Sequence, residues 1–232
     1  MKVKLISYSH PSKEMLEEYD RQIIPDIQDI VAYCARVSNP DNQSNTETSD
    51  RLLRYLIQHK HWSPFEMVSA CLEISTTRDI ARQILRHRSF SFQEFSQRYA
   101  DPVKELSFIT REARLQDTTN RQNSTELDFR RPEHKELARW WLDSQNEILK
   151  LVKQIYTTAL SLGIAKEQAR AILPEGLTES RLYINGTLRS WIHYCELRSA
   201  NGTQLEHMFI AKACAEVISK VFPFLDKIVE KK

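Results

Sequence analysis

The sequence predicts a mixed α/β (α+β) protein, because strand-like and helix-like patterns alternate along its 232 residues. Three segments have the alternating or continuously apolar character of strands, namely residues 3–8, 67–74 and 178–184. Seven segments are predicted helices, namely residues 26–37, 49–59, 79–85, 132–162, 166–172, 188–198 and 204–222. The length suits one domain, or one domain with an appended helical lobe, and we expect residues 1–232 to form a single domain.

In the first third of the chain, local signals mark where each element begins and ends. The segment from Val3 to Tyr8 is the opening strand, and the helix after Asp26 stops before Asn39-Pro40. Ser49-Asp50 can cap a second helix, which has leucines and an isoleucine on one face. Pro64 then forces its neighbour out of helical geometry and leads into the apolar strand 67–74.

The remaining elements follow from similar signals. Pro132 opens a long helix that Gly163 ends, and this helix has an apolar stripe formed by Trp140, Trp141, Ile148, Leu151, Ile155 and Leu160. For the two tryptophans we expect either core packing or a subunit contact. Residues 117–125 are rich in Thr, Asn, Gln and Ser, as expected of a mobile surface loop. Asn185-Gly186-Thr187 is a predicted turn before the helix at Leu188, and the helix at 204–222 is an amphipathic scaffold.

Composition excludes several classes of protein. The net charge of +2 makes a nucleic-acid polymer an unexpected partner, and no apolar run of about 18 residues could span a membrane. The four cysteines are scattered, without a CxxC pair or a histidine cluster, so we expect no metal site, no disulfide framework and a cytoplasmic location. Only four glycines occur, and they form neither a Rossmann glycine loop nor a P-loop.

The segment from Arg86 to Tyr99, RHRSFSFQEFSQRY, is the most informative part of the chain. It interleaves three arginines and a histidine with aromatic residues and serines. One interpretation is a solvated basic loop. The aromatic residues favour a binding loop instead, because guanidinium groups and hydroxyls can hold a phosphate and the edges of a base.

The spacing in this segment resembles the signature of flavin-dependent thymidylate synthases, RHR-x-x-S-x-x-E-x-S-x-R-Y. Four further stretches are similar to motifs of that family and follow in the same order, namely Ala35 to Ser38, His59 to Glu66, Ala169 to Pro174, and Thr187 to Arg198. The family often has asparagine where this chain has Thr187, and histidine where it has Gly202. Histidines at a helix end and arginines along a helix are ordinarily solvated, so the roles below come from the resemblance.

The resemblance implies a fold, an assembly and a reaction. The fold would be an antiparallel central sheet flanked by helices, with a long-helix lobe, in a homotetramer whose active sites draw on several subunits. The reaction would convert dUMP to dTMP, with methylenetetrahydrofolate as one-carbon donor, FAD as the redox cofactor and NADPH as its reductant. No side chain can donate a hydride, so such a reaction needs a cofactor. The other class of thymidylate synthase uses a cysteine after proline, and this chain has no Pro-Cys.

The resemblance also implies two overlapping sets of site residues. For FAD they are Ser38, His61, Ser63, Glu66, Arg86, His87, Arg88, Gln93, Glu94, Thr187, Arg189 and His193. For dUMP they are Gln83, Arg86, Glu94, Ser96, Gln97, Arg98, Arg170 and Arg198. Catalytic roles fall to Arg198, Ser96 and His61, with His61, His87 and Arg88 lining the flavin and folate side. The alternative is a non-catalytic nucleotide- or RNA-binding protein that uses the same basic aromatic loop.

Overall fold

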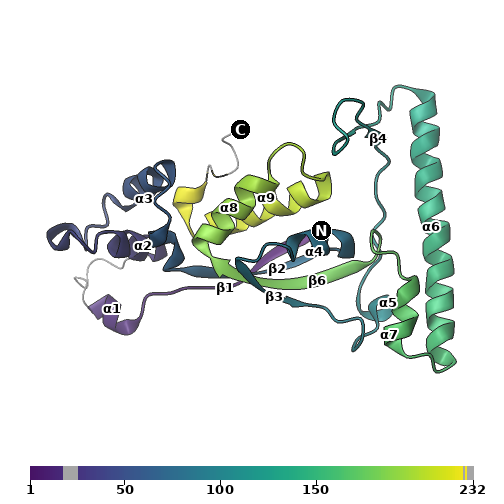
Figure 1. Cartoon of the computed structure of the whole chain (residues 1–232), viewed down its shortest axis with the longest axis horizontal. Coiled ribbons are helices and arrows are strands. Elements are labelled where there is room, and N and C mark those ends of the chain that lie inside the picture. Colours follow the sequence, from purple (N-terminus) through teal and green to yellow (C-terminus); the bar gives the residue numbers. More distant parts are fainter. Residues whose placement is uncertain (18–25, 227, 229–232) are drawn as a thin grey trace.

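A four-stranded antiparallel sheet forms the centre of the protein, in a computed structural model that describes residues 1–17, 26–226 and 228 (Figure 1). The strand order is β1-β2-β6-β3, and the bounds are β1 (Lys2–Tyr8), β2 (Ser69–Thr77), β6 (Glu179–Thr187) and β3 (Phe90–Glu94). Every neighbouring pair is antiparallel. The mixed fold and the antiparallel sheet are therefore confirmed.

Strand β3 lies inside the segment for which we expected a binding loop. Its side chains alternate, with Phe90 and Phe92 half-buried and Ser91 and Gln93 exposed, which is the period of a strand with one face on the core. It pairs with β6, where Ser91 lies opposite Asn185. The basic ends of the segment therefore flank a strand, and only those ends are loops.

The turn predicted at Asn185-Gly186-Thr187 is wrong, because these residues complete β6. Gly186 is needed for space, since a Cβ on it would overlap the ring of Phe90 on the neighbouring strand. Thr187 then caps the following helix by accepting a hydrogen bond from the backbone N–H of Ser190 at 3.4 Å. The strand thus continues directly into the helix.

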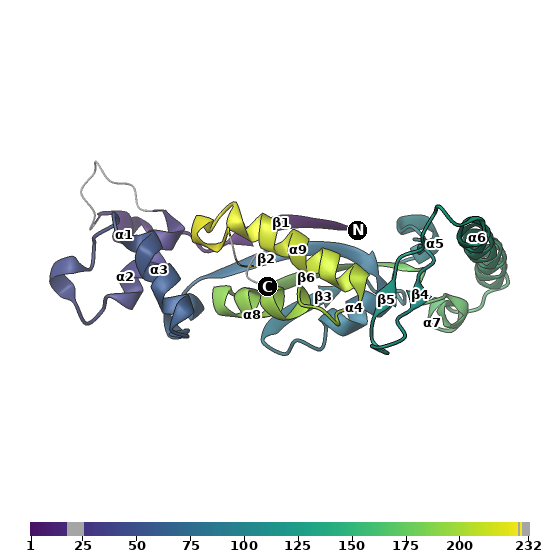
Figure 2. The same ribbon diagram turned by 90° about the horizontal axis from the view of Figure 1, so that it is seen from above.

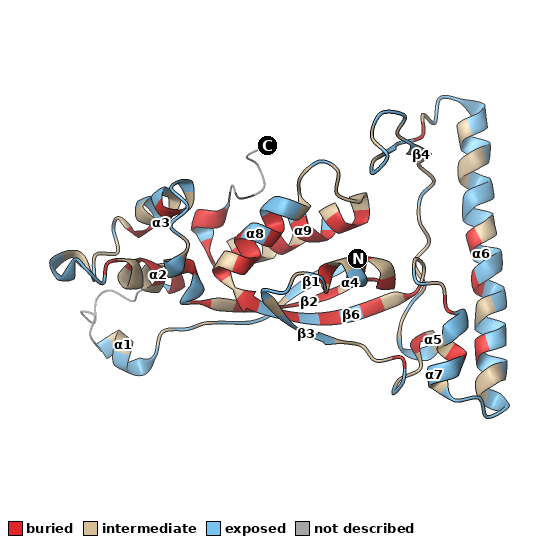
Figure 3. Ribbon diagram, in the orientation of Figure 1, coloured by how far each residue is buried: buried red, intermediate tan, exposed pale blue. Residues whose placement is uncertain are grey.

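Three helices cover one face of the sheet (Figures 1 and 2). They are α4 (Arg78–Ile84), α8 (Leu188–Arg198) and α9 (Leu205–Ser219), and α9 is followed by the short 3-10 helix η4 (Pro223–Leu225). The buried residues of β2 alternate with half-buried ones, and those of β6 alternate mainly with exposed ones. The buried residues join these helices in the main core, as the red segments of Figure 3 show. The opposite face carries Arg181, Tyr183 and Asn185, all of which are exposed.

The N-terminal helices lie at one end of the sheet (Figure 1). Helices α2 (Ile27–Ala35) and α3 (Ser49–Gln58) pack against each other and fall within the predicted segments. The short elements α1 (Lys13–Glu17), η1 (Pro40–Asn42) and η2 (Ser63–Glu66) were not predicted. The 3-10 helix η2 contacts both α2 and α8, so it joins this end of the molecule to the core.

A helical lobe lies at the other end of the sheet (Figure 1). It contains the long helix α6 (Pro132–Ser161), the short helices α5 (Pro102–Glu105), α7 (Lys166–Ala169) and η3 (Arg170–Ile172), and the small hairpin of β4 (Leu115–Gln116) and β5 (Ser124–Thr125). A separate apolar cluster around the buried ring of Tyr156 holds the lobe together. No helix in the described part of the chain is long and apolar enough to cross a membrane.

Two expectations for this lobe need correction. Trp140 and Trp141 are 61% and 37% exposed, so of the two interpretations of these tryptophans, core packing is wrong. Ile148 and Leu151 of the same stripe are also exposed, at 50% and 56%. Within the expected loop at 117–125, residues 124–125 form β5 and residues 117–123 form the closed end of the β4–β5 hairpin. There the carboxylate of Asp117 accepts hydrogen bonds from the backbone N–H groups of Thr119 and Asn120 at 2.8 and 3.0 Å. Their polar composition therefore reflects turn chemistry.

Candidate active site

The C-terminal end of α8 pairs with the first turn of the signature segment. The Nε–H of Arg198 donates a hydrogen bond to Nε2 of His87 at 2.9 Å, and the His87 ring meets Tyr194 edge-on, with 5.0 Å between centroids. Burial and the charge of Arg198 lower the pKa of His87 to about 4, so the imidazole is neutral at pH 7 and carries its proton on Nδ1. His87 thereby fixes the direction of the Arg198 side chain.

The two motifs expected to contact flavin from distant parts of the chain lie side by side. Arg189 on α8 forms an ion pair with Glu66 in η2. One turn further along α8, the ring of His193 meets Trp62 edge-on, with 4.4 Å between centroids. His61 directly precedes Trp62 and is exposed. The turn at 61–66 and the start of α8 therefore form one continuous surface, as the resemblance predicts for FAD contacts.

The turn between α4 and β3 borders the same helix. The hydroxyl of Ser190 donates a hydrogen bond to the backbone carbonyl of Ser89 at 3.1 Å, which fixes this turn against α8. Arg86 and Arg88 flank His87 in the turn, are exposed, and have no carboxylate partner among the described residues. Two unpaired guanidinium groups beside a polar helix surface fit the charge of a pyrophosphate such as that of FAD.

Glu94 belongs to a different group of charges, at the end of β3. Its carboxylate accepts a hydrogen bond from the Ser180 hydroxyl at 2.8 Å and lies 3.6 and 3.7 Å from the guanidinium groups of Arg78 and Arg82. Burial lowers the pKa of Arg78, and the nearby charge of Arg170 adds to the effect. The charge of Arg170 on η3 therefore acts on the same group of charges. Around Glu94 this group contains the cations Arg78, Arg82 and Arg170.

The last part of the signature segment lies against α7. Arg98 pairs with Glu167 at 3.2 Å, and the Lys166 ammonium donates a hydrogen bond to the backbone carbonyl of Tyr99 at 3.0 Å. Ser96 accepts a 3.4 Å hydrogen bond from the backbone N–H of Arg98, and no described histidine contacts its hydroxyl. Gln97 is 3% exposed, and its Nε2 has no partner among the described residues.

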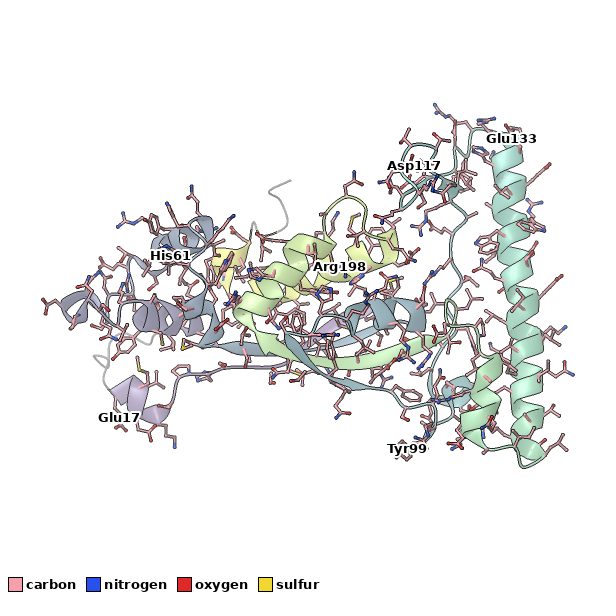
Figure 4. The ribbon with its side chains drawn as sticks, viewed as in Figure 1. Glu17, His61, Tyr99, Asp117, Glu133 and Arg198 are labelled. Atoms are coloured by element: carbon pink, nitrogen blue, oxygen red, sulfur yellow. The ribbon has the colours of Figure 1, made fainter. Side chains whose placement is uncertain are left out.

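The predicted site residues thus form two groups within one chain. We call the first the α8 group, which contains His87, Arg198, Gln83, the turn at 86–89 and the surface around Arg189. We call the second the α7 group, which contains Glu94, Ser96, Gln97, Arg98 and Arg170. Figure 4 shows Arg198 beside the sheet and Tyr99 of the neighbouring segment at the α7 end, well apart from it. The structure therefore does not bring Arg98 or Arg170 into contact with Arg198.

Three predicted FAD residues lie away from the core of the α8 group. Gln93 is exposed on the outer surface of β3, and Glu94, which belongs to the α7 group, pairs with Arg78 and Arg82 on α4. Ser38 is exposed after the end of α2, while Thr187 lies at the start of α8. A cleft of about 620 Å³ between the Arg111–Arg114 segment, α6 and α9 contains none of the predicted site residues.

Sequence reasoning missed several residues that hold the predicted ones. Arg78, Arg82 and Ser180 neutralise or bond Glu94, and Gln204 and His207 hydrogen-bond Gln83. The spacing of Arg78 and Arg82, four residues apart on α4, was the one available signal, since it places both on the same helix face. Nothing in the sequence near Gln204 indicates a contact with α4.

Comparisons with known proteins agree with the motif order. The profile of the Thy1 family, described as thymidylate synthase complementing protein, matches residues 18–224. A probable flavin-dependent thymidylate synthase of Paramecium bursaria Chlorella virus 1 is 46% identical over 230 residues, which cover 99% of both chains. The flavin-dependent thymidylate synthase of Synechocystis is 47% identical over 201 residues, which cover 87% of this chain and 88% of that one.

A solved structure shows the same fold at lower identity. The UMP/dUMP methylase PolB from Streptomyces cacaoi, crystallised with 5-Br dUMP, superposes with a TM-score of 0.78. The two chains are 22% identical, and the match covers 99% of this chain and 94% of the other. The signature segment, the four accompanying motifs, the matched profile and the close relatives lead to one conclusion. This chain belongs to the Thy1 family, the family of the flavin-dependent thymidylate synthases.

Proposed function

We propose that this protein is a flavin-dependent thymidylate synthase that converts dUMP to dTMP. The one-carbon unit comes from methylenetetrahydrofolate, and NADPH reduces the bound FAD. The observation that carries the proposal is the α8 group, where the neutral His87 orients Arg198 beside two arginines without carboxylate partners. This arrangement offers directed cationic groups to anionic ligands without a glycine-rich loop.

The α8 group holds FAD in this proposal. Arg86 and Arg88 bind its pyrophosphate, and the surface formed by His61, Ser63, Glu66, Arg189 and His193 holds the rest of the cofactor. After reduction by NADPH, the bound flavin would supply the hydride that no side chain of the protein can donate. Burial, with the charge of Arg189, lowers the pKa of His193, so this imidazole stays neutral beside the cofactor at pH 7.

The nucleotide lies between the α8 group and the α7 group. Arg98 and Arg170 bind its phosphate, Arg198 and Gln83 contact the base, and Ser96 donates a hydrogen bond to it. Ser96 does not act as a nucleophile, because attack by a serine requires a general base within hydrogen-bond reach. Its observed partner is the backbone N–H of Arg98, which is a donor and cannot accept the proton. The protein therefore forms no covalent bond to dUMP.

Assembly into a homotetramer brings the two groups together. Trp141, Ile148 and Ile155 follow one another at intervals of seven residues on α6, so they share one face of the helix, and all three are exposed. Leu151 extends the same face. An exposed apolar stripe of this length is suited to packing against another copy of the chain. Each active site then takes its α8 group and its α7 group from different subunits.

Flavin binding is the first expected result. The purified protein should retain visible flavin absorbance through gel filtration, or regain it when FAD is added, and a doubly substituted Arg86→Ala, Arg88→Ala variant should lose it. Arg51→Ala, which changes an exposed arginine on α3, is the matched control and should bind FAD normally. A colourless protein at saturating FAD that instead binds RNA in a salt-dependent manner would support the nucleotide- or RNA-binding alternative.

A further inference from the structure

A chain of partly buried hydrogen bonds connects Gln83 to a carboxylate on α9. Gln83 Nε2 lies 2.8 Å from Oε1 of Gln204, and Gln204 Nε2 lies 2.9 Å from Oε2 of Glu206. On the other side, Oε1 of Gln83 lies 3.1 Å from Nδ1 of His207. His207 Nε2 in turn lies 3.2 Å from the hydroxyl of Tyr194. Glu206 and His207 are both buried, whereas Gln83 and Gln204 are partly exposed.

The carboxylate determines the direction of every hydrogen bond in this chain. An oxygen of Glu206 accepts a charged hydrogen bond from the guanidinium group of Arg114, and a carboxylate in such a pair can only accept. Gln204 must therefore present its NH₂ group to Glu206 and its carbonyl oxygen to Gln83. Gln83 must then donate from Nε2 and accept at Oε1. Among the described partners, a reversed amide would place two donors or two acceptors face to face.

The direction extends to His207. Its Nδ1 must carry a proton to donate to Gln83, so Nε2 accepts from the hydroxyl of Tyr194. Burial, with the charge of Arg198, lowers the pKa of His207 to about 3, so the ring holds only this one proton at pH 7. The order is thus Tyr194 to His207 to Gln83 to Gln204 to Glu206, each donating to the next.

We propose that Glu206 is a positioning residue that locks the amide of Gln83 in one orientation and thereby makes the site select uracil over cytosine. This inference rests on the proposed function, in which Gln83 contacts the base. The locked amide retains one N–H and one oxygen lone pair for a ligand. These match a uracil edge, whose O4 accepts and whose N3–H donates. Cytosine reverses that donor and acceptor pattern, and the locked amide cannot turn to match it.

Glu206→Gln tests the lock with nearly unchanged volume, because a glutamine can donate as well as accept and no longer imposes a direction. We expect the ratio of dUMP affinity to dCMP affinity to decrease by about three- to tenfold, which corresponds to the free energy of one hydrogen bond. Both affinities are measured by calorimetry on the FAD-loaded protein without folate. Gln204→Met removes the hydrogen bonds between Gln83 and Glu206 and should decrease the affinity ratio as well. Asp79→Asn removes a different carboxylate near α4, paired with Arg111, and should leave the ratio unchanged.

A second readout does not depend on the nucleotide. In the ligand-free protein, ¹⁵N NMR should show His207 protonated on Nδ1, and Glu206→Gln should mix the two tautomers. Wild-type protein that binds no dUMP but shows the Nδ1–H tautomer would contradict the proposed function and leave the lock intact. The proposed orientation of Gln83 would be overturned if His207 of the wild-type protein carried its proton on Nε2. It would also be overturned if the Glu206→Gln and Gln204→Met variants folded and kept the wild-type affinity ratio.

Discussion

Mixing Arg198→Ala subunits with Arg170→Ala subunits should restore activity that neither variant has alone. Arg198 belongs to the α8 group and Arg170 to the α7 group, and no described contact within one chain joins Arg198 to Arg170. If each site takes the two groups from different subunits, random mixing gives about a quarter of the sites two intact halves. The experiment is co-expression with two affinity tags, sequential purification and a dTMP assay.

The control for this experiment is a pair of variants from the same group. Arg170→Ala mixed with Arg98→Ala should recover no activity, because every α7 group contributed by either subunit carries a defect. If this control recovered as much activity as the first mixture, the recovery would not depend on which group carries the substitution. No recovery in the Arg198→Ala and Arg170→Ala mixture, with tetramers formed, would show that each site is built within one chain.

Arg198→Ala should lower kcat/KM for dUMP by roughly 10²- to 10³-fold, the usual effect of removing a charged donor directed at a reacting group. The hydrogen bond from its Nε–H to His87 fixes the guanidinium group before the nucleotide binds. Arg198→Lys keeps the charge but lacks the planar fork, so we expect most of the loss to persist. Steady-state kinetics with FAD present would measure both variants.

Two checks make this result specific to Arg198. Flavin absorbance should remain in both variants, because Arg198 is not among the residues proposed for FAD. Arg51→Ala should have wild-type kcat/KM, since this exposed arginine lies on α3, outside both groups. If kcat/KM for dUMP fell by less than about threefold in Arg198→Ala, Arg198 would have no role in the reaction beyond its contact with His87.

Hydrophobic periodicity predicted most of the fold, because it reports which face of each element is buried. It found β1, β2, β6 and the long helix α6 within a few residues. It did not identify β3, since the alternation of Phe90 and Phe92 with polar residues occurs within a highly basic segment. It left the stripe of α6 undecided, because core packing and subunit contact produce the same pattern of apolar residues.

The site was predictable only where residues are close in sequence. The motifs identified His87, Arg198 and the turn at 61–66, and the structure places these around α8. The partners that orient them could not be predicted, because Gln204 and His207 contact Gln83 across more than a hundred residues of chain. Such contacts depend on how α4 and α9 pack on the sheet, and neither helix carries a local signal of the other.

The most direct test of the account is product formation from dUMP by the purified protein. With FAD, NADPH and methylenetetrahydrofolate present, mass spectrometry should detect dTMP, and omission of methylenetetrahydrofolate should abolish it. Apoprotein stripped of flavin should form none until FAD is restored. The account would be contradicted if FAD-loaded tetramers formed no dTMP, or if flavin-free protein formed it at the same rate.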